Sequence, residues 1–308
     1  MIHRTAGAGA GAGGADVAGG PLVVIHAGAG AGRSLRDHEE RCHAVLREAL
    51  SSARAALEAG GDATEAVHAA VRILEGFELF NAGRGAALCS DGSVELSAAI
   101  MRGSDRAAGA AAGIRHARWP IDAARSVLRS DQVLMIGGHA DAYAAEMGAE
   151  QVPASYFITD RQRDALRTKV AGEDHGTVGA VCLDRHGTLA AATSTGGIGG
   201  QPPGRVGDSP LIGAGTWADG HVAVSCTGDG EAFIRAGAAH NVAALVAHGA
   251  SLVDACDVVL ADVGELGGAG GVIAVDARGN AALPFVTAAM PRGLWRPGSD
   301  PQVAIGGP

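Results

Sequence analysis

Residues 175–181 read HGTVGAV, residues 193–197 read TSTGG and residues 204–210 read GRVGDSP. The first two stretches belong to apolar runs, 177–183 and 188–195, on either side of a polar Asp-Arg-His-Gly turn. This pattern predicts a β-hairpin with Thr177 as its first residue. A threonine inside a chain is a poor nucleophile, but a threonine at a new N-terminus has an α-amine of pKa roughly 7.7 to 8.0 that accepts its hydroxyl proton. We therefore expect an enzyme that cuts itself to expose this threonine.

Strands and helices arrive in paired blocks on both sides of this hairpin. The apolar patterns predict strands at 22–25, 85–88, 94–101, 132–136, 222–225, 271–276 and 281–285, and helices at 37–59, 62–75, 120–128, 140–147, 230–247 and 252–263. Strict βαβ alternation is missing, so stacked antiparallel sheets with helical layers are favoured over a Rossmann fold.

The bulk composition predicts one large domain. The chain has 308 residues, of which 47% are hydrophobic and only 3% aromatic, so small aliphatic side chains must fill the core. Residues 1–20 are mostly Ala and Gly and are expected to be a disordered extension, which leaves 21–308 as the domain. The polar segment 151–175 is predicted to be an accessible linker before Thr177.

Charge and cysteine usage exclude several function classes. A formal charge of -9 disfavours nucleic acid and anionic membranes as partners, so a small molecule or a dipeptide is the expected substrate. The five cysteines contain no CxxC pair and are expected to be reduced core residues. Without the apolar core of a signal peptide or a membrane-spanning run, the chain is expected to be cytoplasmic.

Five motifs occur in chain order: LFNAG at 79–83, GTVGAV at 176–181, ATSTGG at 192–197, PGRVGDSP at 203–210 and CTGDGE at 226–231. Together they resemble the plant-type L-asparaginases and isoaspartyl peptidases, which are N-terminal nucleophile hydrolases related to glycosylasparaginase. The resemblance spans residues 21 to 293. It implies an α+β fold, a four-layer αββα sandwich, with autocatalytic cleavage between Gly176 and Thr177. The products would be an α chain of residues 1–176 and a β chain of residues 177–308, assembled as a homodimer of αβ protomers.

The resemblance assigns the catalytic residues. Thr177 corresponds to the nucleophile, and Thr195 to a second threonine beside it that tunes proton transfer. Thr227 and Gly228 correspond to an oxyanion hole, which acyl transfer needs because negative charge develops on the attacked carbonyl oxygen. Asn81 belongs to a glycine-flanked loop near the nucleophile. Each residue also has an ordinary interpretation, as a strand-end hydroxyl or a turn residue.

Arg205 and Asp208 form a candidate binding site for a zwitterion. They are three residues apart in a loop bounded by glycines and a proline, so both side chains can face one small cavity. Arginine suits a carboxylate and aspartate suits an ammonium, as in the α-groups of an aspartyl substrate, although a surface ion pair is the simpler alternative. Gly230 would line the amine pocket by the resemblance.

The expected reaction is a two-step acyl transfer through Thr177 that releases aspartate and requires no cofactor. The family's loop corresponding to Glu75–Ala86 often holds a structural sodium ion through backbone carbonyls. The leaving group is open, because Asp229-Gly230 favours the glycosylasparaginase form of its motif and Gly196-Gly197 the asparaginase form.

Some positions differ from the family pattern. Ala27 directly follows His26, where the family usually has consecutive glycines, and would strain the turn if that position required a positive φ. Ser97 replaces an aspartate, Val286 an asparagine and Ala289 a glycine. Three alternative functions stay open. They are a glycosylasparaginase-like amidase, an uncleaved inactive relative that binds amino acids or acts as a scaffold, and, more distantly, a nucleotide-binding protein that uses the glycines at 7–14.

Overall fold

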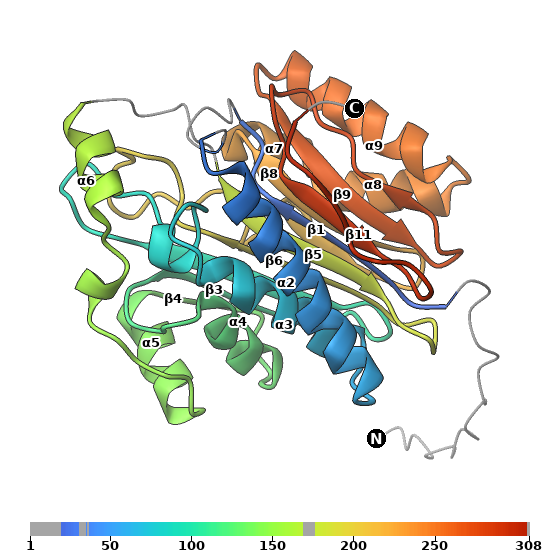
Figure 1. Cartoon of the computed structure of the whole chain (residues 1–308), viewed down its shortest axis with the longest axis horizontal. Coiled ribbons are helices and arrows are strands. Elements are labelled where there is room, and N and C mark those ends of the chain that lie inside the picture. Colours follow the sequence, from blue (N-terminus) through green and yellow to red (C-terminus); the bar gives the residue numbers. More distant parts are fainter. Residues whose placement is uncertain (1–19, 31–34, 36, 169–175, 307–308) are drawn as a thin grey trace, which may run out of the picture.

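Two β-sheets form the centre of the protein in a computed structural model that describes residues 20–30, 35, 37–168 and 176–306 (Figure 1). Within these residues, the larger sheet has eight strands in the order β12-β11-β1-β5-β6-β2-β3-β4. Its pairs are antiparallel except β3 with β4. The strands are β1 (Leu22–Ala27), β2 (Leu96–Arg102), β3 (Ala108–Ile114), β4 (Leu134–Ile136), β5 (Thr177–Leu183), β6 (Leu189–Thr195), β11 (Arg292–Trp295) and β12 (Gln302–Ala304).

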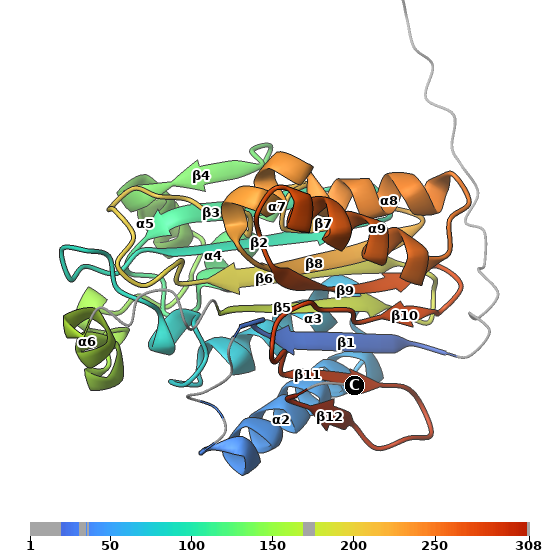
Figure 2. The ribbon, with the colours of Figure 1, turned by 90° about the horizontal axis from the view of Figure 1, so that it is seen from above.

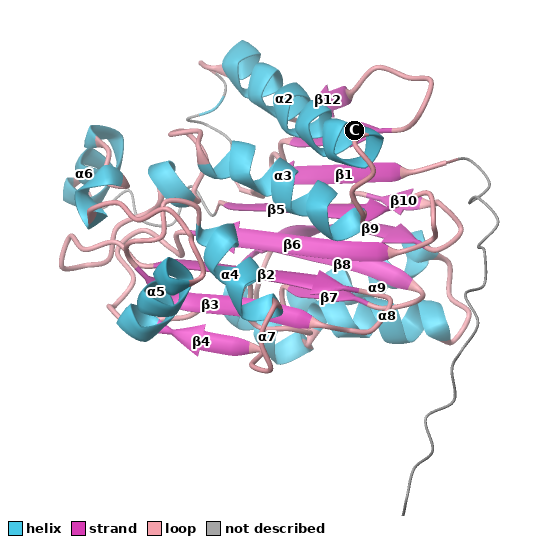
Figure 3. Cartoon of the chain, turned by 90° about the horizontal axis from the view of Figure 1, so that it is seen from below, coloured by secondary structure: helices cyan, strands magenta, loops and turns pink. Residues whose placement is uncertain are grey.

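A smaller antiparallel sheet packs on one face of the larger one. Its order in the described part of the chain is β10-β9-β8-β7, with β7 (Thr216–Ala218), β8 (Val222–Gly228), β9 (Gly270–Asp276) and β10 (Ala281–Ala282). Figures 2 and 3 show helices covering the outer faces of the two sheets. The helices are α2 (Glu39–Glu58), α3 (Ala63–Glu75), α4 (Pro120–Leu128), α5 (Gly137–Glu146), α6 (Asp160–Arg167), α7 (Gly230–Ala236), α8 (Ala238–Ala247) and α9 (Leu252–Glu265), with short 3-10 turns η1 (Gly83–Gly85) and η2 (Ala154–Tyr156).

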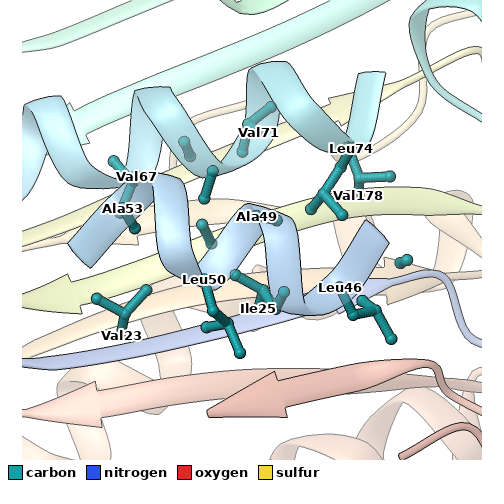
Figure 4. Close-up of a cluster of buried hydrophobic side chains, with 14 of the residues drawn as sticks. Val23, Ile25, Leu46, Ala49, Leu50, Ala53, Val67, Val71, Leu74 and Val178 are labelled. Atoms are coloured by element: carbon teal, nitrogen blue, oxygen red, sulfur yellow. The ribbon is translucent and has the colours of Figure 1, made fainter. Parts of the chain in front are cut away.

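Strand alternation divides the core into separate apolar layers. Val23 and Ile25 of β1 point toward α2 and α3, where they meet Leu46, Leu50 and other buried side chains (Figure 4). Leu22 and Val24 point the other way, into the layer between the two sheets. A third layer, between the smaller sheet and helices α7 to α9, contains alternate β8 residues such as Val222 and Val224. The result is a mixed α/β protein with sheets inside and helices outside.

Most predicted elements are confirmed. The hairpin of β5 and β6 has Thr177 as its first residue, α4 has the predicted bounds, and the predicted helices at 37–59, 62–75, 140–147 and 252–263 are α2, α3, α5 and α9. All five cysteines are buried and free, as expected for reduced core residues. The Ala/Gly extension lies outside the described residues apart from Gly20, as does 169–175 of the predicted linker.

Three predictions are wrong for identifiable reasons. Residues 85–88 form no strand but a 3-10 turn and a single bridge from Leu88 to Val94, because Gly83 takes a left-handed conformation with φ +51°. The predicted helix 230–247 breaks into α7 and α8 at Gly237, where φ is +56°. The polar segment 151–175 contains helix α6, whose one buried residue is Gln162, so no run of buried apolar side chains marks this helix in the sequence.

Strand β3 was missed because its sequence, AGAAAGI, has little β-propensity; its pairing with β2 and β4 makes it a strand. The short strands β7, β11 and β12 were missed as well. Ala27 causes no strain: it ends β1 opposite Val178, and Arg106 is the one non-glycine residue in the described ranges with a positive φ. Among the helices that the structure describes, none is long and apolar enough to cross a membrane.

The fold predicts a strong dependence on Leu50, which is fully buried between α2 and the larger sheet (Figure 4). Leu50→Ala should lower the free energy of unfolding by about 2–5 kcal/mol, because the lost apolar contacts leave a cavity. Urea unfolding followed by circular dichroism measures this. Val258→Ala, at a position 55% exposed on α9, is the control and should change stability by less than about 0.5 kcal/mol. Equal effects would contradict the packing described here.

Candidate active site

The antiparallel register of β5 and β6 places Thr195 directly opposite Thr177. Both side chains are buried, and the Thr177 hydroxyl donates to Thr195 Oγ1 at 3.3 Å. The Thr195 hydroxyl in turn donates to the carbonyl oxygen of Gly176 at 3.2 Å and accepts from the Gly197 N–H at 3.0 Å. A chain of hydroxyls therefore connects Thr177 with the carbonyl group of the peptide bond just before it.

The loop that contains Asn81 closes one side of this pair. The Asn81 amide donates to the Gly197 carbonyl at 2.6 Å and accepts from the Ala87 N–H at 2.7 Å, while its main-chain oxygen accepts from the Gly196 N–H at 3.0 Å. A Cβ on Gly176 would lie only 2.6 Å from the Asn81 Cβ, so this position requires glycine. Asn81 therefore holds the end of β6 against its own loop, beside the Gly176–Thr177 bond.

A buried polar chain lies next to Thr177, between the two sheets. His26 Nδ1 accepts from the Gly28 N–H, so Nε2 carries the proton and donates to Ser225 Oγ at 3.0 Å. The Ser225 hydroxyl contacts the Thr193 hydroxyl at 2.8 Å. Burial lowers the pKa of His26 to about 3, against a smaller opposing effect of a hydrogen bond with the Thr177 backbone. His26 is therefore neutral and joins β1, β5 and β8.

Sequence reasoning missed the role of His26 and Ser225. A Cβ on Gly179 would lie 2.1 Å from Ser225 Oγ and 2.4 Å from His26 Nε2, so this glycine makes room for their contact. The signal in the sequence was a polar residue within each of two apolar runs, His26 at the end of β1 and Ser225 in β8.

Alternation along the strands brings the predicted oxyanion-hole residues to the same place. Thr193 and Thr195 lie on one face of β6, as Ser225 and Thr227 lie on one face of β8. Since Thr193 contacts Ser225, the next pair along, Thr195 with Thr227, lies at the same end of the space between the sheets as Thr177. The Ala29 N–H donates to Thr227 Oγ1 at 3.2 Å, which ties the first glycine-rich turn to this end.

Gly228 requires glycine, and Gly230 leaves little room for a side chain. Gly228 has φ +143°, and a Cβ there would lie 2.3 Å from the Ala269 carbonyl oxygen. At Gly230 a Cβ would lie 2.9 Å from Arg205 Nη2 and 3.0 Å from Asp208 Oδ1. Arg205 and Asp208 therefore converge over Gly230 at the start of α7.

Arg205 does not form its ion pair with Asp208. Its guanidinium makes a two-pronged contact with Glu231, Nε to Oε1 at 2.9 Å and Nη2 to Oε2 at 2.8 Å. Asp208 is 4% exposed, and its Oδ2 has no hydrogen-bond partner among the described residues. Burial raises the pKa of Asp208 to about 7, although the nearby Arg205 lowers it. A buried carboxylate with one oxygen that lacks a hydrogen-bond partner is suited to a cationic group supplied from outside.

The loop after α3 presents main-chain oxygens. A Cβ on Gly85 would lie 2.2 Å from the Phe80 oxygen and 2.6 Å from the Glu78 oxygen, and one on Gly83 would lie 2.4 Å from the Glu75 oxygen. No cluster of three His, Cys, Asp or Glu side chains that could hold a metal occurs in the part of the chain that the structure describes. Any cation here would depend on carbonyl oxygens.

Comparison with known proteins agrees with these motifs. A protein-family model described as asparaginase matches residues 19–305. The chain is 47% identical over 306 residues to an isoaspartyl peptidase of Salmonella typhimurium, covering 92% of this chain and 98% of that protein.

Other relatives agree. The chain is 45% identical to an isoaspartyl peptidase of Escherichia coli, with 92% of this chain and 95% of that protein covered. It is 36% identical to a human isoaspartyl peptidase/L-asparaginase, with 93% and 96% covered. The family model matches nearly the whole fold, and the relatives are similar over almost their full length. The chain therefore belongs to the asparaginase family.

Proposed function

We propose that this protein is an autoprocessing threonine hydrolase that cleaves β-aspartyl (isoaspartyl) peptides and L-asparagine. The observation that carries this proposal is the hydroxyl chain from Thr177 through Thr195 to the Gly176 carbonyl, at the end of the sheets where Arg205 and Asp208 converge. The names of the relatives, isoaspartyl peptidase and isoaspartyl peptidase/L-asparaginase, support the substrate class.

Self-cleavage would begin with attack of Thr177 Oγ1 on the carbonyl carbon of Gly176. The new C–O bond forms as the C–N bond breaks, and the proton from the hydroxyl ends on the freed amine of Thr177. Water then hydrolyses the ester, leaving an α chain of 1–176 and a β chain of 177–308. The Thr195 hydroxyl supports this step because it donates to the carbonyl oxygen on which negative charge develops.

Substrate hydrolysis would use the same hydroxyl. The freed α-amine accepts the Thr177 proton, Oγ1 attacks the β-carbonyl carbon, and the amine or ammonia leaves with that proton. Water releases aspartate from the acyl-enzyme. Thr227 and Gly228 stabilise the oxyanion, Arg205 binds the α-carboxylate, and Asp208 binds the α-ammonium beside Gly230.

We also propose the finer architecture of the family for this chain, a four-layer αββα sandwich of the N-terminal nucleophile hydrolase type formed by residues 21–308. The separate apolar layers on both sides of each sheet support it. A homodimer of αβ protomers is proposed as well. Exposed Val133, Leu134 and Ile136 at the free edge strand β4 favour association.

The Glu75–Ala86 loop fits a structural sodium ion, although the reaction as proposed requires no cofactor. Carbonyl oxygens of Glu75, Glu78 and Phe80 crowd around Gly83 and Gly85, and hard cations prefer oxygen ligands. An ion there would hold the loop that carries Asn81. We further propose a cytoplasmic location, which five free, buried cysteines support.

Self-cleavage predicts two fragments. The intact mass of the purified protein after prolonged incubation should resolve a piece ending at Gly176 and a piece starting at Thr177. Thr177→Ala should stay whole, because it removes the attacking oxygen, while Thr177→Ser should still be cut. A wild-type chain that remains unbroken and inactive would favour the alternative of an inactive binding or scaffold protein.

The substrate class is tested with β-aspartyl dipeptides, L-asparagine and glycosylated asparagine. The first two should release aspartate, whereas turnover of glycosylated asparagine alone would support the glycosylasparaginase-like alternative. Arg205→Lys should lower kcat/KM about 10- to 100-fold, because lysine lacks the planar two-pronged donor. Arg235→Lys, on the exposed side of α7, is the matched control and should leave kcat/KM unchanged.

Asp208→Asn should abolish activity yet stabilise the fold at pH 8. Because the pKa of Asp208 is raised, the folded chain binds the carboxyl proton more tightly than the unfolded chain does. The contribution of the protonated Asp208 to stability is therefore present in full below pH 3.8 and is lost as pH rises through about 7. In a Thr177→Ala background, urea unfolding should show a gain of about 1–3 kcal/mol at pH 8 that shrinks toward pH 4.

Asp257→Asn on the exposed face of α9 is the control for that comparison and should give no pH-dependent gain. A stability gain for Asp208→Asn that is the same at pH 4 and pH 8 would contradict a buried carboxylate that titrates near pH 7.

A further inference from the structure

Four buried polar side chains connect the candidate nucleophile with the loop that contains Asp208. They are His26, Ser225, Thr193 and Thr216, which we call the inter-sheet network. Each is fully buried, and each comes from a different strand, β1, β8, β6 and β7 in that order. Strands β1 and β6 belong to the larger sheet and β7 and β8 to the smaller one, so the network crosses between the sheets.

One end of the inter-sheet network contacts the main chain of the nucleophile strand. In the register of β1 with β5, His26 lies opposite Gly179, two residues after Thr177. The imidazole lies against Gly179, where a Cβ would be only 2.4 Å from Nε2, and the Thr177 backbone forms a hydrogen bond with the same ring. From there Nε2 donates to Ser225 Oγ at 3.0 Å.

The other end contacts the loop that contains Asp208. The Thr193 hydroxyl donates to the Gly215 carbonyl at 3.3 Å. The Thr216 hydroxyl donates to Thr193 Oγ1 at 2.6 Å and to the Ser209 carbonyl at 3.0 Å. Gly215 lies directly against Asp208, because a Cβ there would be 2.8 Å from Oδ2. The network therefore ends beside the buried carboxylate.

The hydrogen bonds of the inter-sheet network run in one direction. Carbonyl oxygens accept and cannot donate, so the protons at the loop end point toward Gly215 and Ser209. Neutral His26 donates to Ser225 at the other end, and the Ser225 hydroxyl donates in turn to Thr193 at 2.8 Å. A buried network in which every member is paired holds its groups in one arrangement.

Local main-chain bonds shape the Asp208 loop but do not set its distance from Thr177. The N–H groups of Leu211 and Gly215 donate to the Asp208 carbonyl at 2.9 and 3.1 Å, so these bonds close the loop on itself. The inter-sheet network, by contrast, joins the loop to a histidine that contacts the nucleophile's own backbone.

We propose that Ser225, Thr193 and Thr216 position Asp208 relative to Thr177, and so fix where the α-ammonium group of the substrate is held with respect to the nucleophile. They are positioning residues, because they act through Asp208. This inference rests on the function proposed above. It separates the two reactions, since self-cleavage involves the bond before Thr177 and does not use Asp208.

Thr216→Val tests this role, because valine keeps the shape of the side chain and lacks the hydroxyl. The KM for a β-aspartyl dipeptide should rise about tenfold or more, since a displaced Asp208 binds the ammonium group poorly. The rate of self-cleavage should stay within about twofold of the wild-type rate. Thr216→Ser retains the hydroxyl and should restore most of the lost affinity.

Hydrogen exchange followed by mass spectrometry tests the position of the loop without any need for activity. In a Thr177→Ala background, the amides of residues 203–212 should exchange about tenfold faster when Thr216→Val is added. Ser225→Ala breaks the network at another link and should act in the same direction if Thr216→Val does not fold.

Thr188→Val is the matched control. Thr188 is partly exposed and lies in the turn at the other end of the β5–β6 hairpin, so this change should alter neither KM nor loop exchange. A wild-type protein that is neither cut nor active on the dipeptide would refute the proposed function, and loop exchange alone then decides the positioning role.

Three results overturn the positioning role. The first is unchanged loop exchange in Thr216→Val and Ser225→Ala. The second is a loss of self-cleavage in Thr216→Val as large as the loss of dipeptide hydrolysis, which indicates general damage to the fold. The third is a Thr216→Ser variant as impaired as Thr216→Val.

Discussion

The antiparallel register that sets Thr177 opposite Thr195 is the constraint on which the rest of the candidate site depends. A shift of either strand by one residue would turn its hydroxyl to the other face of the sheet, into the apolar layer beneath α3. The register is fixed by that layer, where Val178 and Ala192 pack, and by Gly179, which lets His26 reach Ser225. The apolar core on one side of the hairpin therefore determines the chemistry on the other.

The space between the two sheets is apolar at one end and rich in hydroxyl groups at the other. At the apolar end, Val181 and Leu183 of β5 pack against the smaller sheet. At the other end, residues 177 and 179 on the same face of β5 lie beside the polar side chains of Thr195 and Ser225. Such a buried polar network is tolerable because its members are paired and His26 is neutral. The apolar end supplies the stability that lets the polar end be positioned rigidly.

Sequence patterns predicted the elements whose period was strong and the residues whose motifs were distinctive. The hairpin that pairs Thr177 with Thr195 was predictable, as was the closeness of Arg205 to Asp208, because a hairpin and a short glycine-bounded loop are local structures. Their catalytic and binding roles stay predictions. Strand β3 could not be predicted, because a run of Ala and Gly has little preference for a strand and becomes one only by pairing with its neighbours. The His26–Ser225 contact spans 199 positions, so no local pattern contains it.

The separation of Arg205 from Asp208 has a physical rationale under the proposed function. If the two closed on each other, their charges would cancel and neither end of a zwitterion would be attracted. Arg205 instead makes a two-pronged contact with Glu231, whose side chain is 60% exposed. Burial raises the pKa of Asp208 to about 7, and its Oδ2 has no hydrogen-bond partner among the described residues. The ammonium group of the substrate supplies the positive charge that Asp208 lacks. Burial of this carboxylate destabilises the free protein, and it makes the site selective for an amino group.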